Sequence, residues 1–191
     1  MRLKGLSSAP AAQRTLLWIS LLVVASVMFS LGFACATPFA AFAAAAAITS
    51  SRRDALALIL SVWFVNQFVG FTVLGYPWTP STLAWGAALG AAAALAVLAG
   101  QWAASCSPGA GRSVGFLTTF LAAFAVYEAA LFAVALLLLG GTEDFTASIL
   151  GWIFVVNIAA FVALLALHRL AVFLGVATNP AIPFGVTESH A

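Results

Sequence analysis

Long apolar runs separated by short polar breaks set the pattern of this chain. A membrane-spanning helix needs about 20 mainly apolar residues, and five of the six apolar runs reach about that length. The six runs lie near Thr15–Phe33, Cys35–Ile48, Ala55–Leu74, Thr82–Ala103, Val114–Leu139 and Thr146–Leu167. The pattern predicts an all-α integral membrane protein, built as a six-transmembrane-helix bundle.

The second run is the shortest, and Thr37-Pro38 lies close to its start. Proline has no N–H and interrupts an α-helix, so it marks a boundary here. The run is therefore interpreted as a short span, with two alternatives. It is either a half-span, or it forms one broken helix with the first run.

Composition agrees with a membrane protein. Of the 191 residues, 64% are hydrophobic and only 6% are charged, and the mean hydropathy is +1.15. A water-soluble domain of this length could not bury so much apolar surface, whereas a bilayer accommodates it.

The distribution of basic residues predicts the orientation. With a cytoplasmic N-terminus, all seven basic residues fall on the cytoplasmic side: Arg2, Lys4, Arg14, Arg52, Arg53, Arg112 and Arg169. The opposite side carries Glu143 and Asp144 and no basic residue. Because Lys and Arg in the loops set topology, we predict a multi-pass protein of a bacterial-type inner membrane with both termini inside. Its parts are a cytoplasmic segment 1–14, a transmembrane domain 15–173 and a cytoplasmic tail 174–191.

An alternative concerns the first run. The basic N-terminus, the first apolar run and Ala34-Cys35-Ala36 also fit a secretory signal with a small-x-small cleavage site. Cleavage would leave five spans and keep the later loops on the same sides. The run from Leu16 to Phe33 is longer than the usual core of a signal peptide, which favours a retained first span.

Three spans carry strongly polar residues close to their midpoints. These residues are Asn66 and Gln67, Tyr127 and Glu128, and Asn157. An acidic residue at the bilayer centre costs about 2.5–3.5 kcal/mol on insertion scales and usually faces the protein interior. Since no Lys or Arg lies at that depth, Glu128 must be neutral, hydrogen-bonded to amides and hydroxyls, or matched to an incoming cation. We predict a substrate pocket among spans three, five and six; alternatively, these groups only bond one another and lock the bundle.

The third span suggests which residues share that pocket. Trp63, Asn66 and Gly70 lie on one helical face, whereas Gln67 points about 100° away from Asn66. We therefore assign Trp63 and Asn66 to the pocket and Gln67 to helix packing. The turn Gly75–Pro80 follows on the non-cytoplasmic side, where Tyr76 and Trp78 either cover the ligand or anchor two helix ends at the membrane interface.

Small residues predict close helix contacts in the second and fourth spans. Gly86 and Gly90 are four residues apart, and Ala36, Ala40 and Ala44 form a ridge with the same spacing. Small residues let helices approach closely in lipid. The alanine ridge therefore indicates either internal packing or a face that docks a partner protein.

Several function classes find no support in the sequence. It contains no HExxH, P-loop or dinucleotide motif, so we expect no enzyme, no catalytic residues, no cofactor and no metal site. The scattered basic residues form no nucleic-acid-binding stripe. Cys35 and Cys106 do not form a disulfide framework.

The predicted plan resembles a known family. A chain of 191 residues with six spans, both ends inside and an alanine ridge is similar to the S components, the substrate-binding membrane subunits of energy-coupling-factor vitamin transporters. The resemblance implies a ligand held near the outer face, and a coupling membrane subunit and an ATPase as partners not encoded here. In that family the docking ridge lies on the first span, whereas here Ala36, Ala40 and Ala44 lie on the second.

These observations together predict a membrane transport protein, an uptake subunit for a vitamin-like small molecule. The alternative is an accessory subunit without catalytic activity that assembles or stabilises a larger membrane complex. In that case the polar residues at mid-depth would serve helix packing.

Overall fold

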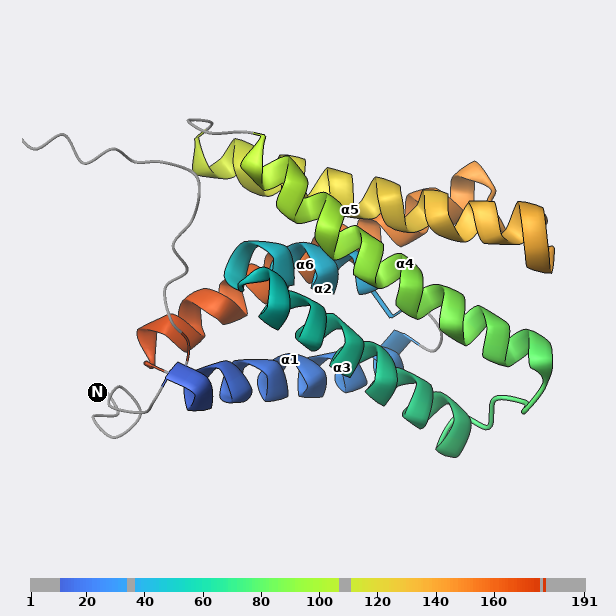
Figure 1. Ribbon diagram of the computed structural model, residues 1–191, viewed down its shortest axis with the longest axis horizontal. Coiled ribbons are helices and arrows are strands. Elements are labelled where there is room, and N and C mark those ends of the chain that lie inside the picture. The colour runs from blue at the N-terminus through green and yellow to red at the C-terminus, as the bar shows by residue number, and fades with distance from the viewer. Residues whose placement is uncertain (1–10, 34–36, 107–110, 176, 178–191) are drawn as a thin grey trace, which may run out of the picture.

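The computed structural model describes residues 11–33, 37–106, 111–175 and 177. Every regular element in these ranges is helical (Figure 1). The elements are α1 (Ala11–Phe33), α2 (Phe39–Thr49), α3 (Arg52–Thr72), α4 (Pro80–Ser105), α5 (Arg112–Val134), the π-helical turn η1 (Ala135–Leu139), the 3₁₀ turn η2 (Thr142–Asp144) and α6 (Ala147–Phe173).

Four helical segments are long and apolar enough to cross a membrane: α3, α4, α5 continued by η1, and α6. Two shorter apolar helical stretches, Leu16–Met28 within α1 and the whole of α2, accompany them. An all-helical bundle of the membrane type is thus confirmed. The number of crossings and the side that each end faces stay predictions.

The predicted grouping of the basic residues has a counterpart in the arrangement of the helices. In Figure 1 the starts of α1, α3 and α5 and the end of α6 lie at the left of the bundle. Arg52 and Arg112 begin two of these helices, and Arg169 lies in the last turns of α6. The α3–α4 and α5–α6 connections lie at the opposite end, which we call the connection end.

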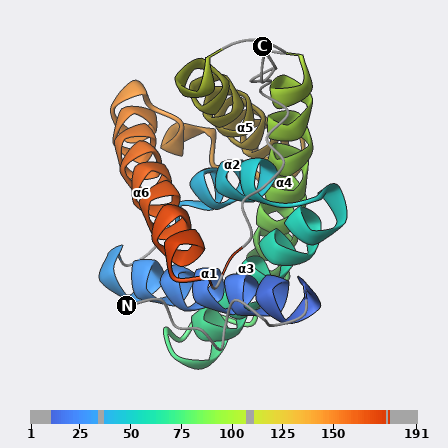
Figure 2. The ribbon, with the colours of Figure 1, turned by 90° about the vertical axis from the view of Figure 1, so that its left-hand side faces the viewer.

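The second predicted span is only a half-span. Helix α2 has 11 residues and is about 16 Å long at 1.5 Å per residue, whereas the hydrocarbon core of a bilayer is about 30 Å thick. All of its residues are buried, and it contacts α3, α4, α5 and α6. Figure 2 shows α2 in the middle of the bundle, so this short helix forms the bundle's core.

Small side chains allow α2 to occupy this central position. A Cβ added to Gly100 of α4 would lie 3.1 Å from Ala47 Cβ of α2 and 3.2 Å from Thr119 Cγ2 of α5. Backbones that approach this closely gain van der Waals contact that lipid cannot supply.

Hydroxyl side chains fix the start of three long helices. Ser51, Thr79 and Thr146 precede α3, α4 and α6, and each accepts a hydrogen bond from the backbone N–H three residues later. Such N-caps satisfy N–H groups that have no partner within the helix. In α4 the cap is followed by Pro80, whose fixed φ suits the first helical position.

Candidate functional site

A cavity of about 350 Å³ lies between α2, α3, α4, α5 and α6. Its lining includes Tyr76 from the α3–α4 connection and Asp144 from η2 between α5 and α6, so it is located toward the connection end. The other end of the lining is formed by Thr37 and Phe39 at the start of α2. Because α2 is only half as long as its neighbours, the centre of the bundle beyond its first residue is left for this cavity.

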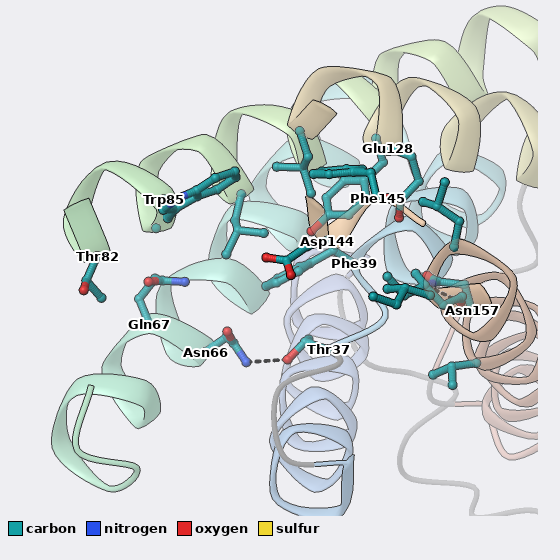
Figure 3. A pocket seen from close by; sticks show the side chains of 18 of the residues that line it. Thr37, Phe39, Asn66, Gln67, Thr82, Trp85, Glu128, Asp144, Phe145 and Asn157 are labelled. Atoms are coloured by element: carbon teal, nitrogen blue, oxygen red, sulfur yellow. Dashed lines mark hydrogen bonds between the residues drawn. The ribbon is translucent and has the colours of Figure 1, made fainter. Parts of the chain in front are cut away.

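Five of the predicted pocket residues line the cavity: Asn66, Tyr76, Tyr127, Glu128 and Asn157. They come from α3, the α3–α4 connection, α5 and α6, and Figure 3 shows Asn66, Glu128 and Asn157 around the same space. Their meeting agrees with the predicted pocket among spans three, five and six.

Trp63 and Trp78 do not belong to the lining. Trp63 lies between α3 and α4, where its Nε1 donates to the Gly86 carbonyl oxygen at 2.7 Å, and a Cβ on Gly90 would lie 2.7 Å from its ring. Trp78 is 73% exposed and packs on Phe71 with ring centroids 4.4 Å apart. Trp63 therefore packs toward α4 although it shares a predicted helical face with Asn66, and Trp78 packs against the last turns of α3.

Gln67 and Asn66 both line the cavity, although we expected only one of them there. A Cβ on Gly86 would lie 2.6 Å from Gln67 Oε1, so Gln67 also packs on α4 as predicted. Adjacent helical positions point about 100° apart, yet both amides reach the cavity. The reason is that the cavity extends from α4 to α2 and borders a wide part of the circumference of α3.

Gly70 makes room for Tyr76. The Tyr76 N–H donates to the Gly70 carbonyl oxygen at 3.0 Å, and a Cβ on Gly70 would lie 2.5 Å from the Tyr76 ring. The turn thus folds back on the last turns of α3. This close approach brings Tyr76 from the connection into the cavity wall.

The two asparagines hold the start of α2 in place. Asn66 Nδ2 donates to Thr37 Oγ1 at 2.7 Å, shown by the dashed line in Figure 3. Asn157 Oδ1 accepts from the Ala41 N–H at 3.0 Å, and its Nδ2 donates to the Ile153 carbonyl oxygen at 3.0 Å. Asn157 therefore satisfies a backbone donor in the first turn of α2. Both amides combine a place in the cavity wall with a packing role.

Sequence reasoning did not assign Asp144 to the site. Gly140 and Gly141, with φ of 76° and 90°, adopt a conformation that glycine takes without strain, and η2 follows them directly. Asp144 and Phe145 then reach the cavity, and Figure 3 shows both among the side chains around it. The usable signal was an acidic residue just before span six, on the same side as the Tyr76 turn.

The predicted docking ridge is covered by the chain itself. Ala40 and Ala44 have 0% exposure, and Ala36 lies outside the described residues. A partner cannot touch the two described alanines in this conformation. The structure therefore supports the internal-packing interpretation of the ridge, because only small side chains let α2 fit at the centre of four helices.

No protein-family model, no curated protein and no solved structure matches this chain. The functional argument therefore rests on the geometry and chemistry of the cavity.

Proposed function

We propose that this chain is a membrane transport protein that takes up a small molecule, which binds in the central cavity. The supporting observation is the cavity itself, about 350 Å³ in volume and lined by carboxylate, amide and phenol groups. Protein interiors are close-packed, and small-molecule sites are apolar cavities of about 300–1,000 Å³ with a few placed polar groups. A bundle that needed only to pack would fill this space.

The predicted orientation gives the direction of transport. If the basic end faces the cytoplasm of a bacterial-type inner membrane, the cavity lies toward the outside and receives its ligand there. The chain carries no ATPase motif, so uptake needs an ion gradient or separate partners, such as a coupling membrane subunit with an ATPase, as in the S components. Because Ala40 and Ala44 are covered, such a coupling subunit would dock on another face.

A thermal-unfolding screen of the purified full-length chain tests this proposal. The library contains cationic, anionic and neutral small molecules, including vitamins, and each hit is followed by uptake in cells that express the chain. We expect at least one compound to raise the unfolding temperature and to accumulate in those cells.

A cavity-filling variant supplies the specificity control. Leu89 lines the cavity from α4, and Leu95 lies on the same helix but is 49% exposed. Leu89→Trp should abolish ligand stabilisation and uptake, whereas Leu95→Trp should retain both. The proposal fails if no compound stabilises the chain, or if Leu89→Trp accumulates the hit at the normal rate.

The second candidate is an accessory subunit, favoured by Asn157. The oxygen and the nitrogen of its amide both bond within the bundle, as expected of a residue that locks helices together. Under this function, deleting the chain would disassemble a larger membrane complex and leave the uptake of every screened compound unchanged.

A further inference from the structure

Two acidic side chains line the cavity without a hydrogen-bonding partner among the residues that the structure describes. Glu128 is half-buried on α5, and Asp144 is exposed in η2. Within the described residues, no hydrogen bond or ion pair joins either carboxylate to another side chain or backbone group. The lining of the cavity in that part of the chain contains no Lys, Arg or His.

Two amide donors of the lining are directed elsewhere. Asn66 Nδ2 donates to Thr37, and Asn157 Nδ2 donates to the Ile153 carbonyl oxygen. A carboxylate removed from water is costly unless a charge or several donors compensate it. The cavity therefore has a deficit of positive charge that a ligand could supply.

The remaining wall suits the apolar part of such a ligand. Phe39, Tyr76, Trp85, Tyr127 and Phe145 surround the cavity together with aliphatic side chains. The faces of aromatic rings attract cations that lie within about 6 Å of the ring centre. Carboxylates and aromatic rings in one cavity both favour a positively charged organic group.

We propose that the cavity binds an organic cation, an ammonium group on an apolar body, with the charge matched by Glu128 and Asp144. The inference deepens the proposed function and rests on it, since it names the substrate class of the same cavity. A volume of about 350 Å³ equals roughly twelve water volumes of about 30 Å³. The ligand thus has on the order of a dozen non-hydrogen atoms. A neutral or anionic ligand of this size would leave the half-buried Glu128 carboxylate without a positive partner.

Three probes of similar shape and different charge test the proposal on the full-length chain. They are 2-phenylethylammonium, 2-phenylethanol and phenylacetate, measured by calorimetry at pH 7, where the amine is protonated as lysine is. We expect the ammonium ion to bind at least about tenfold more tightly than the alcohol, and phenylacetate to bind more weakly still.

Charge variants then identify the carboxylates. Glu128→Gln should weaken ammonium binding at least about tenfold, and Asp144→Asn about two- to fivefold because Asp144 is exposed. Glu128→Asp, which keeps the charge, should retain more affinity than Glu128→Gln. Glu143→Gln is the matched control, since Glu143 precedes Asp144 in η2 but does not line the cavity; it should leave affinity unchanged within about twofold.

The outcomes separate this inference from the proposed function. Equal or tighter binding of the alcohol overturns the inference, as does undiminished ammonium affinity in the Glu128→Gln and Asp144→Asn variants. Tighter binding of phenylacetate overturns it too and assigns selectivity to the positive end of α2.

If the ammonium probe does not bind but the library gives a neutral or anionic hit sensitive to Leu89→Trp, only this inference falls. If no molecule of any charge binds, both proposals fall. Should Glu128→Gln fail to fold, Glu128→Asp and Asp144→Asn decide the test.

Discussion

Replacing Gly90 with alanine tests how closely α3 and α4 must approach. A Cβ at Gly90 would lie 2.7 Å from Trp63 Cε2 and 2.8 Å from its Nε1, whereas carbon atoms pack best at about 3.5–4.0 Å. The indole must therefore move by roughly 1 Å. It cannot retreat without weakening its 2.7 Å bond to the Gly86 carbonyl oxygen.

The expected loss of stability follows from three contributions. Overpacking costs about 1–3 kcal/mol, and losing the indole hydrogen bond costs about 0.5–1.5 kcal/mol. The change from glycine to alanine within a helix returns about 0.5–1 kcal/mol. We expect Gly90→Ala to lower the free energy of unfolding by about 2 kcal/mol, within about 0.5 to 4.

The matched control is Gly151→Ala in α6, where an added Cβ meets no atom within 4 Å. The helical gain is similar at both positions, so the difference between the two variants isolates the contact with Trp63. Reversible unfolding in mixed detergent micelles, followed by circular dichroism, measures both. A Gly90→Ala variant as stable as Gly151→Ala would refute the reasoning. So would a Trp63→Phe background in which Gly90→Ala costs just as much, because contacting residues should couple.

Two further substitutions test the contacts around the cavity. Asn157→Leu removes the acceptor of the Ala41 N–H. We expect the free energy of unfolding to fall by about 1–3 kcal/mol in the same assay. If this variant is as stable as the wild type, water or another group satisfies that N–H. Gly70→Ala places a Cβ 2.5 Å from the Tyr76 ring, and we expect it to displace Tyr76 and to weaken binding of the library hit severalfold. The free energy of unfolding should fall by less than about 1.5 kcal/mol, because the turn that carries Tyr76 is at the surface. Wild-type affinity in that variant would show that Tyr76 contributes nothing to the ligand.

The half-length of α2 connects the fold to the cavity. A full span in its place would occupy the centre of the bundle at every depth, and the polar groups of α3, α5 and α6 would then pack against it. Because α2 begins at Phe39, Asn66 and Asn157 instead bond to its first turn or to Thr37 just before it. Beyond that turn the same helices enclose a space with Glu128 in its wall.

The sequence by itself determined the helical, membrane-type character of this protein and most helix boundaries. Both follow from local features: the length of the apolar runs, the capping residues such as Ser51 and Thr79, and the prolines at breaks. The depth of polar residues is also local, because residue number along a helix measures depth at 1.5 Å per residue. This is why Asn66, Tyr127, Glu128 and Asn157 could be grouped before any contact was known.

Only the tertiary structure decided which way side chains face. Trp63 shares a helical face with Asn66 but packs on Gly86 and Gly90 of α4, since the rotation of α3 is set by its neighbours. Asp144 entered the site because the backbone reverses at Gly140 and Gly141, and sequence spacing does not give the direction of a loop. The alanines of α2 pack inside for a similar reason. An all-apolar helix has no polar face to indicate its exposed side, so only its surroundings determine whether it is a surface or a core.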